Sequence, residues 1–114
     1  MEVIVTRTRL REGCEVDYEA AHRVLPDDVR TDLLERGAVD WKIFRDGRDL
    51  IHVITLATSY ESFRSTRPYP EVNERWQREM SKFIEPPSPG DQTGPLALIW
   101  NLADELPDEL RDRL

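Results

Sequence analysis

The sequence is poor in the residues that carry most covalent and metal chemistry. It has one cysteine, Cys14, and two histidines, His22 and His52, among 114 residues. A single cysteine can form neither an internal disulfide nor a cysteine-based metal site. The sequence also contains no nucleophile motif, metal-ligand cluster or glycine-rich phosphate loop. We therefore expect chemistry, if there is any, to proceed without a metal ion or another cofactor.

Long apolar runs and an excess of positive charge are also missing. No stretch approaches the roughly 20 apolar residues of a membrane span, and the charged N-terminal residues lack the apolar core of a signal peptide. Sixteen Lys and Arg residues stand against 23 Asp and Glu residues, giving a formal net charge of −7. This balance argues against nucleic acid and anionic membranes as partners. The expected class is a soluble cytoplasmic protein.

The hydrophobic pattern predicts one α+β domain over residues 1–102 and an acidic tail over residues 103–114. The expected elements are strand 2–10, helices 15–25 and 27–37, strands 39–44 and 50–57, a helical turn 60–66, helix 71–83 and strand 96–102. An Asp-Gly step between the two middle strands is typical of a tight hairpin. The order predicts a ferredoxin-like split βαβ fold, with four antiparallel strands and helices on one face.

The strands at both ends of the predicted domain are apolar enough to lie inside the sheet rather than at its edge. Helices on one face leave the second face of the sheet uncovered. A bare apolar face on so small a domain is a liability. We therefore expect a homodimer packed sheet to sheet, as in a dimeric α/β barrel.

Tyr18 and His22 are the strongest functional signal in the sequence. Four residues apart in a predicted helix, their side chains share one face, within reach of a common ligand. Histidine is the side chain best suited to move protons near neutral pH. His52 alternates with Leu50 and Ile54 on its strand, so it is either a hydrogen-bonded histidine of a half-buried sheet or a second residue facing the same cavity.

Three stretches carry a resemblance to a known family. They are Tyr18-Glu-Ala-Ala-His22, Gly37-Ala-Val-Asp-Trp41-Lys-Ile-Phe and Glu74-Arg-Trp76-Gln-Arg-Glu-Met80. With them the chain resembles the L-rhamnose mutarotase family over residues 3–101. The resemblance implies a small cytoplasmic homodimer of ferredoxin-like subunits. Its members interconvert the α and β anomers of a free deoxysugar, a small neutral monosaccharide, without metal or cofactor.

The same resemblance implies roles for five residues. His22 corresponds to the acid/base histidine, and Tyr18 to the tyrosine that holds the sugar. Trp41 stands where the family usually has a tyrosine, Trp76 matches the first member of a Trp-Trp pair, and Gln77 occupies the second position. We expect His22 to be catalytic and the other four residues to bind the sugar, since aromatic faces suit the C–H face of a pyranose. The departures bear on which sugar is preferred: L-rhamnose, L-fucose or another hexose.

Two other functions fit the same fold, because a fold does not decide a function. One is a cofactor-free or haem-linked monooxygenase of the small dimeric α/β-barrel type, which would consume O₂. The other is a non-catalytic dimer whose aromatic pocket only binds a sugar or another ligand. Mutarotation remains the leading interpretation, since general acid–base help of about 10²–10⁴-fold is what this modest reaction needs.

Overall fold

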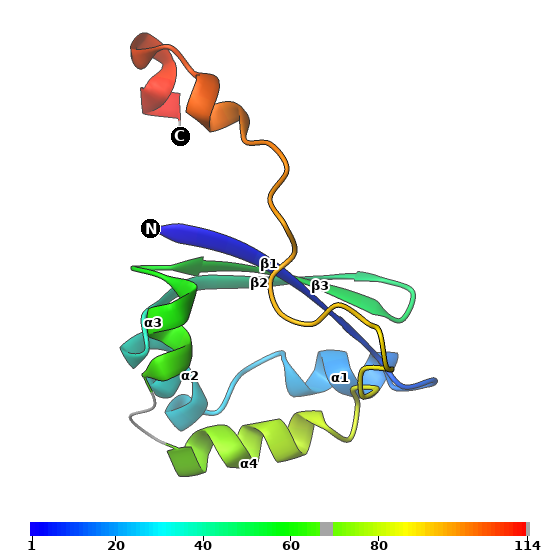
Figure 1. Ribbon diagram of the computed structural model, residues 1–114. Helices are drawn as coiled ribbons and strands as arrows, with labels where there is room; N and C mark the ends of the chain where they lie inside the picture. Colours follow the sequence, from blue (N-terminus) through cyan, green and yellow to red (C-terminus); the bar gives the residue numbers. More distant parts are fainter. Residues whose placement is uncertain (67–69, 114) are drawn as a thin grey trace.

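A computed structural model describes residues 1–66 and 70–113, and its elements confirm an α+β fold (Figure 1). In chain order the elements are β1 (Glu2–Arg9), α1 (Glu15–Ala21), α2 (Asp27–Glu35), β2 (Ala38–Asp46), β3 (Asp49–Leu56), α3 (Tyr60–Ser65), α4 (Pro70–Met80) and the 3₁₀ helices η1 (Leu102–Glu105) and η2 (Asp108–Arg113). The last residue of the predicted tail, residue 114, lies outside the described range.

The fold has two layers. The antiparallel sheet has the strand order β1-β3-β2, and α1, α2 and α4 cover one face of it, while α3 lies near one end (Figure 1). β2 and β3 form the predicted hairpin. Its turn contains Gly47 at φ 59°, a left-handed conformation that glycine adopts at little steric cost.

The core is divided along the strands into two buried clusters. One contains Ile4, Ala38, Ile54, Leu56 and Phe63, and the other contains Leu10, Tyr18, Leu50 and Met80. Between them the inward positions of the sheet are polar: Thr6 and Thr8 on β1, and His52 on β3, with Thr6 opposite His52 in the register. The apolar alternation of both strands is thus interrupted at the same level. The sheet therefore presents a polar strip to the helices in the middle of its inner face.

The prediction of a fourth strand over residues 96–102 is wrong for the single chain. Among the described residues the sheet has three strands, which makes β1 an edge strand rather than the expected inner one. The N–H of Leu96 donates to the carbonyl of Val5 at 2.7 Å. The chain then leaves the sheet on the side opposite the helices (Figure 1). Ile99 is 91% exposed there, because the chain offers no second layer to cover an apolar segment on that side.

Other element boundaries also differ from the sequence prediction, and α4 ends at Met80 rather than at residue 83. α1 ends at Ala21 rather than at residue 25, so that His22 is its C-cap residue. Much of the acidic tail forms η1 and η2, which project from the domain (Figure 1). The projection contributes to a Cα radius of gyration of 16.0 Å, against about 13 Å for a compact chain of this length. None of the helices in the described part of the chain is long and apolar enough to cross a membrane.

Candidate functional site

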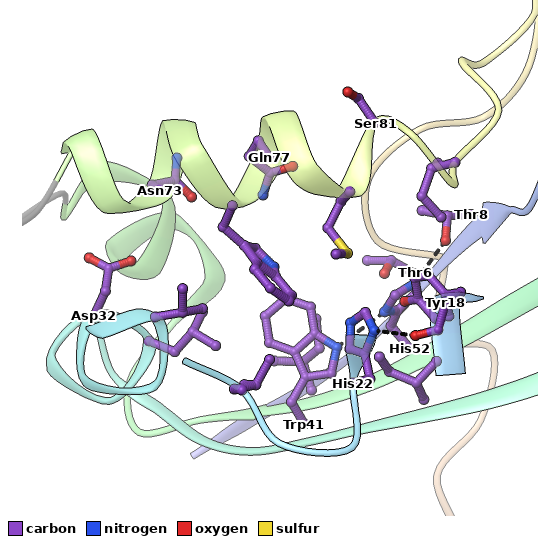
Figure 2. A pocket seen from close by; sticks show the side chains of 18 of the residues that line it. Thr6, Thr8, Tyr18, His22, Asp32, Trp41, His52, Asn73, Gln77 and Ser81 are labelled. Atoms are coloured by element: carbon purple, nitrogen blue, oxygen red, sulfur yellow. Dashed lines mark hydrogen bonds between the residues drawn. The ribbon is translucent and has the colours of Figure 1, made fainter. Parts of the chain in front are cut away.

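A cavity of about 1080 Å³ lies between the inner face of the sheet and the helices. Ligand pockets usually measure about 300–1,000 Å³, so this cavity has ample room for a small molecule. The structure brings all five predicted site residues to its lining: Tyr18, His22, Trp41, Trp76 and Gln77. His52, for which the sequence left two alternatives, also lines it, together with residues from β1, α2 and α4 that sequence reasoning missed (Figure 2).

Tyr18 and His22 form the helix side of the cavity. Although α1 ends before His22, the C-cap residue continues the turn closely enough to keep the two rings together, with centroids 4.2 Å apart. Nδ1 of His22 lies 3.0 Å from the backbone carbonyl oxygen of Tyr18. A carbonyl only accepts, so the neutral imidazole carries its proton on Nδ1 and keeps a lone pair on Nε2. His22 therefore has one anchored ring nitrogen and one that is available to a bound molecule.

The phenol of Tyr18 behaves differently from the imidazole beside it. Tyr18 is 5% exposed, and burial raises its pKa to about 12, because the charged phenolate is poorly solvated there. At neutral pH the side chain is a neutral hydroxyl. It can donate or accept a hydrogen bond, but it is not a base.

α4 supplies a second wall of the cavity. The ring of Trp76 meets that of His22 edge to face, with centroids 5.4 Å apart. Asn73 and Gln77 follow one another on α4 at four-residue spacing (Figure 2), whereas Ser81, just past the end of the helix, donates its hydroxyl proton to the Arg78 carbonyl at 2.6 Å and points away from the cavity. An aromatic face beside amide groups suits a ligand that is apolar on one side and rich in hydroxyl groups elsewhere.

The sheet side of the cavity contains a chain of hydrogen bonds. The indole N–H of Trp41, on β2, donates to Nδ1 of His52, on β3, at 3.1 Å. Nε2 of His52 lies 2.8 Å from Oγ1 of Thr8, on β1. His52 is 8% exposed, and its pKa is lowered to about 4, first by burial and then by the nearby charge of His22. His52 thus satisfies both sequence alternatives, because it is fully hydrogen-bonded and also faces the cavity.

The opposite end of the cavity carries a buried ion pair. Oδ2 of Asp32 lies 3.2 Å from Nε of Arg36, and the Arg36 guanidinium stacks 4.4 Å from the ring centre of Phe63. Asp32 lies far from Thr8 and Tyr18 in the view of Figure 2. Within residues 1–66 and 70–113, no group of three His, Cys, Asp or Glu side chains is arranged to hold a metal ion.

Signals for the missed sheet residues were present in the sequence. Thr6 and Thr8 occupy the same strand face as Ile4 and Leu10, which are buried. Two hydroxyl side chains in the middle of an otherwise apolar inward face indicate a polar strip rather than continuous core. For Asp32 the sequence offered no comparable signal, because it is one of several acidic residues on a short helix.

The fold and the cavity define a small α+β protein with a cavity between its helices and its sheet, beside His22, whose Nε2 has no hydrogen-bond partner among the described residues. Within this class, the chain belongs to the L-rhamnose mutarotase family, whose model matches residues 4–102. This match confirms the resemblance seen in the sequence. The family acts on carbohydrates as isomerases, so the protein is a sugar mutarotase rather than a monooxygenase or a non-catalytic binding protein.

The crystal structure of L-rhamnose mutarotase FA22100 from Formosa agariphila has a similar fold. The TM-score is 0.67 at 17% sequence identity, and the match covers 89% of this chain and 98% of that one. Among curated protein sequences, none is significantly similar to the chain.

Proposed function

We propose that the protein interconverts the α and β anomers of L-rhamnose or a closely related 6-deoxysugar, with His22 as the acid/base residue. The observation that carries this proposal is the hydrogen bond from Nδ1 of His22 to the Tyr18 carbonyl. It leaves Nε2, beside the cavity, with the lone pair that a general base requires. The family assignment supports the reaction, and the aromatic lining supports a neutral sugar.

The reaction opens a cyclic hemiacetal and recloses it on the other face of the aldehyde. Nε2 of His22 takes the proton of the anomeric hydroxyl while the bond between C1 and the ring oxygen breaks. The ring oxygen needs a proton in return. Because both oxygens are bonded to C1, the same imidazolium can deliver it. Rotation about the C1–C2 bond and the reverse proton transfers then give the other anomer, with no net change in protons.

The other predicted residues bind and orient the sugar in this proposal. Tyr18, neutral at its raised pKa of about 12, offers a hydroxyl rather than a charge. Trp41 and Trp76 supply ring faces for the apolar side of the pyranose. Gln77 supplies an amide to a sugar hydroxyl from the α4 side.

Anomer exchange measured by saturation-transfer NMR tests this function. Wild-type protein and His22→Ala are compared on L-rhamnose, L-fucose and several other free hexoses. We expect acceleration for one or a few 6-deoxysugars and a loss of about 10²–10⁴-fold of the catalysed rate in His22→Ala. A folded wild-type protein that accelerates no sugar, or a His22→Ala protein as fast as wild type, would contradict the proposal.

The protein also acts, in this proposal, as a cytoplasmic homodimer joined through the outer face of its sheet. Val3 and Phe44 lie on that face with 59% and 56% of their surface exposed. The apolar segment 96–100 leaves the domain on the same side (Figure 1). A second copy would cover both features at once, whereas exposed apolar patches of this kind are uncommon on monomers.

Light scattering coupled to size exclusion measures the assembly directly. We expect twice the chain mass of 13.4 kDa for the wild type and the single mass for Phe44→Glu, because a buried unpaired charge is costly. Val16→Glu is the matched control, since Val16 is exposed on α1, in the helix layer. A wild-type protein of single mass, or a Phe44→Glu protein that stays dimeric, would refute this assembly.

A further inference from the structure

The inner face of the sheet contains a hydrogen-bonded chain that the proposed mechanism does not use. It runs across all three strands, from Trp41 on β2 through His52 on β3 to Thr8 on β1. All three side chains line the cavity that contains His22 (Figure 2). His52 and Thr8 are 44 positions apart in the sequence, so only the strand order brings them together.

The chemistry of the three groups fixes the direction of every hydrogen bond. An indole N–H is only a donor, so Nδ1 of His52 must accept from Trp41 and carries no proton. The proton of the neutral ring is then on Nε2, which donates to Oγ1 of Thr8 at 2.8 Å. Burial lowers the pKa of His52 to about 4, and the ring is therefore neutral, with this one tautomer, at neutral pH.

Because His52 donates to Thr8, the Thr8 hydroxyl proton is not used in the hydrogen bond between them. The Thr8 hydroxyl oxygen accepts from His52, and the hydroxyl proton is turned away from that ring. His52 is the only hydrogen-bond partner of the Thr8 side chain among the described residues. Thr8 is half-buried and lines the cavity. The free proton is therefore available to an oxygen atom of a molecule bound in the cavity.

We propose that Thr8 is a further sugar-binding residue, which donates a hydrogen bond to one oxygen of the substrate, and that His52 is the positioning residue that turns the Thr8 hydroxyl toward it. This inference rests on the proposed sugar mutarotase function. It assigns the sheet a role that complements the helix side: His22 exchanges protons with the sugar, and Thr8 fixes its orientation from the sheet. Trp41 contributes its ring to the cavity wall and its N–H to His52, so it has no donor left for the sugar.

A substrate-variant cycle tests the Thr8 contact. KM and kcat are measured by NMR anomer exchange for wild type, Thr8→Val and Thr31→Val, on the best sugar and on derivatives that each lack one hydroxyl. Thr31 is exposed on α2 and controls for the same chemical change outside the cavity. We expect Thr8→Val to raise KM by about 2- to 10-fold on the parent sugar, and to have no effect on the one derivative that lacks the contacted hydroxyl.

A purely structural role of Thr8 gives a different pattern. Loss of packing would weaken every deoxy derivative, and also the analogue with a methylene in place of the ring oxygen, by the same factor. That result, or an unchanged KM throughout, would overturn the inference. No deoxy derivative removes a contact to the ring oxygen, so this case needs another probe. The probe is an analogue of the sugar with a methylene in place of the ring oxygen, tested as an inhibitor. If Thr8 donates to the ring oxygen, the analogue should bind equally well to wild type and Thr8→Val.

The role of His52 is tested by two variants and one spectrum. His52→Phe should raise KM in the same sugar-specific way as Thr8→Val, whereas His52→Gln, which can accept from Trp41 and donate to Thr8, should restore part of the lost affinity. Imidazole ¹⁵N NMR of the wild type should find the proton of His52 on Nε2. A proton on Nδ1, or a His52→Phe protein with wild-type KM, overturns the positioning role. If the wild type accelerates no sugar, the proposed function fails instead, and the spectrum still reports on the hydrogen-bonded chain.

Discussion

The two histidines of the cavity differ in how many ring nitrogens the protein itself uses. His22, at the end of α1, gives one nitrogen to a backbone carbonyl at 3.0 Å. His52, in the central strand, gives both nitrogens to side chains on the neighbouring strands, at 3.1 and 2.8 Å. A helix end anchors an imidazole from one side only, while a central strand surrounds it. The position in the fold thus makes one histidine suited to proton exchange and keeps the other neutral and fixed.

The rate of anomer exchange should separate the two histidines most strongly. We expect His22→Ala to lose about 10²–10⁴-fold of the catalysed rate, because it removes the ring nitrogen that has no hydrogen-bond partner among the described residues. His52→Phe should lower kcat by less than about 10-fold and act mainly on KM. The measurement is the same exchange experiment at saturating sugar. Equal losses in the two variants would mean that His52 also transfers protons.

The dependence of stability on pH separates the two histidines by a second route. The folded state lowers the pKa of His52 to about 4 from an ordinary value of 6.5. Between these values the unfolded chain binds a proton that the folded chain does not, so stability falls as the pH falls through this window. The loss is about 3 kcal/mol over the full window.

Urea unfolding at pH 7, 6, 5 and 4 measures this effect. The wild type should lose about 3 kcal/mol more than His52→Phe between pH 7 and pH 4. Carboxylates that titrate in the same range are present in both proteins, and their contribution cancels in the difference. Parallel stability curves for the two proteins would show that His52 is not held neutral by its burial.

Much of the domain could be predicted from the sequence because its signals are local. The Asp46–Gly47 step marks the hairpin, and the helical spacing marks α4. The last strand could not be predicted in the same way. An apolar segment such as 96–102 indicates that something covers it, but whether a strand of the same chain or of a second copy does so depends on contacts that the segment does not encode.

In the site, too, local contacts could be predicted from the sequence and contacts between distant segments could not. The contact of Tyr18 with His22 follows from a spacing of four residues, and it survives although the helix is one turn shorter than predicted. The hydrogen bonds of His52 depend on the hairpin register with Trp41 and on the placement of Thr8 across the sheet. These hydrogen bonds therefore depend on tertiary structure. An alternating pattern can say that His52 points inward, but it cannot say which tautomer the neighbours select.

The smallest expected effect comes from Trp41→Phe, which keeps an aromatic ring in the cavity wall and removes one donor. Nδ1 of His52 then loses the N–H that holds it unprotonated, and the loss of one buried hydrogen bond should cost about 1 kcal/mol in the free energy of unfolding. Imidazole ¹⁵N NMR should then detect both tautomers of His52, while His22 keeps its proton on Nδ1. A single unchanged tautomer of His52 in Trp41→Phe would mean that Thr8, on β1, fixes the orientation of the ring without help from Trp41. The difference between His52 and His22 would then depend on the hydrogen bond to Thr8 alone.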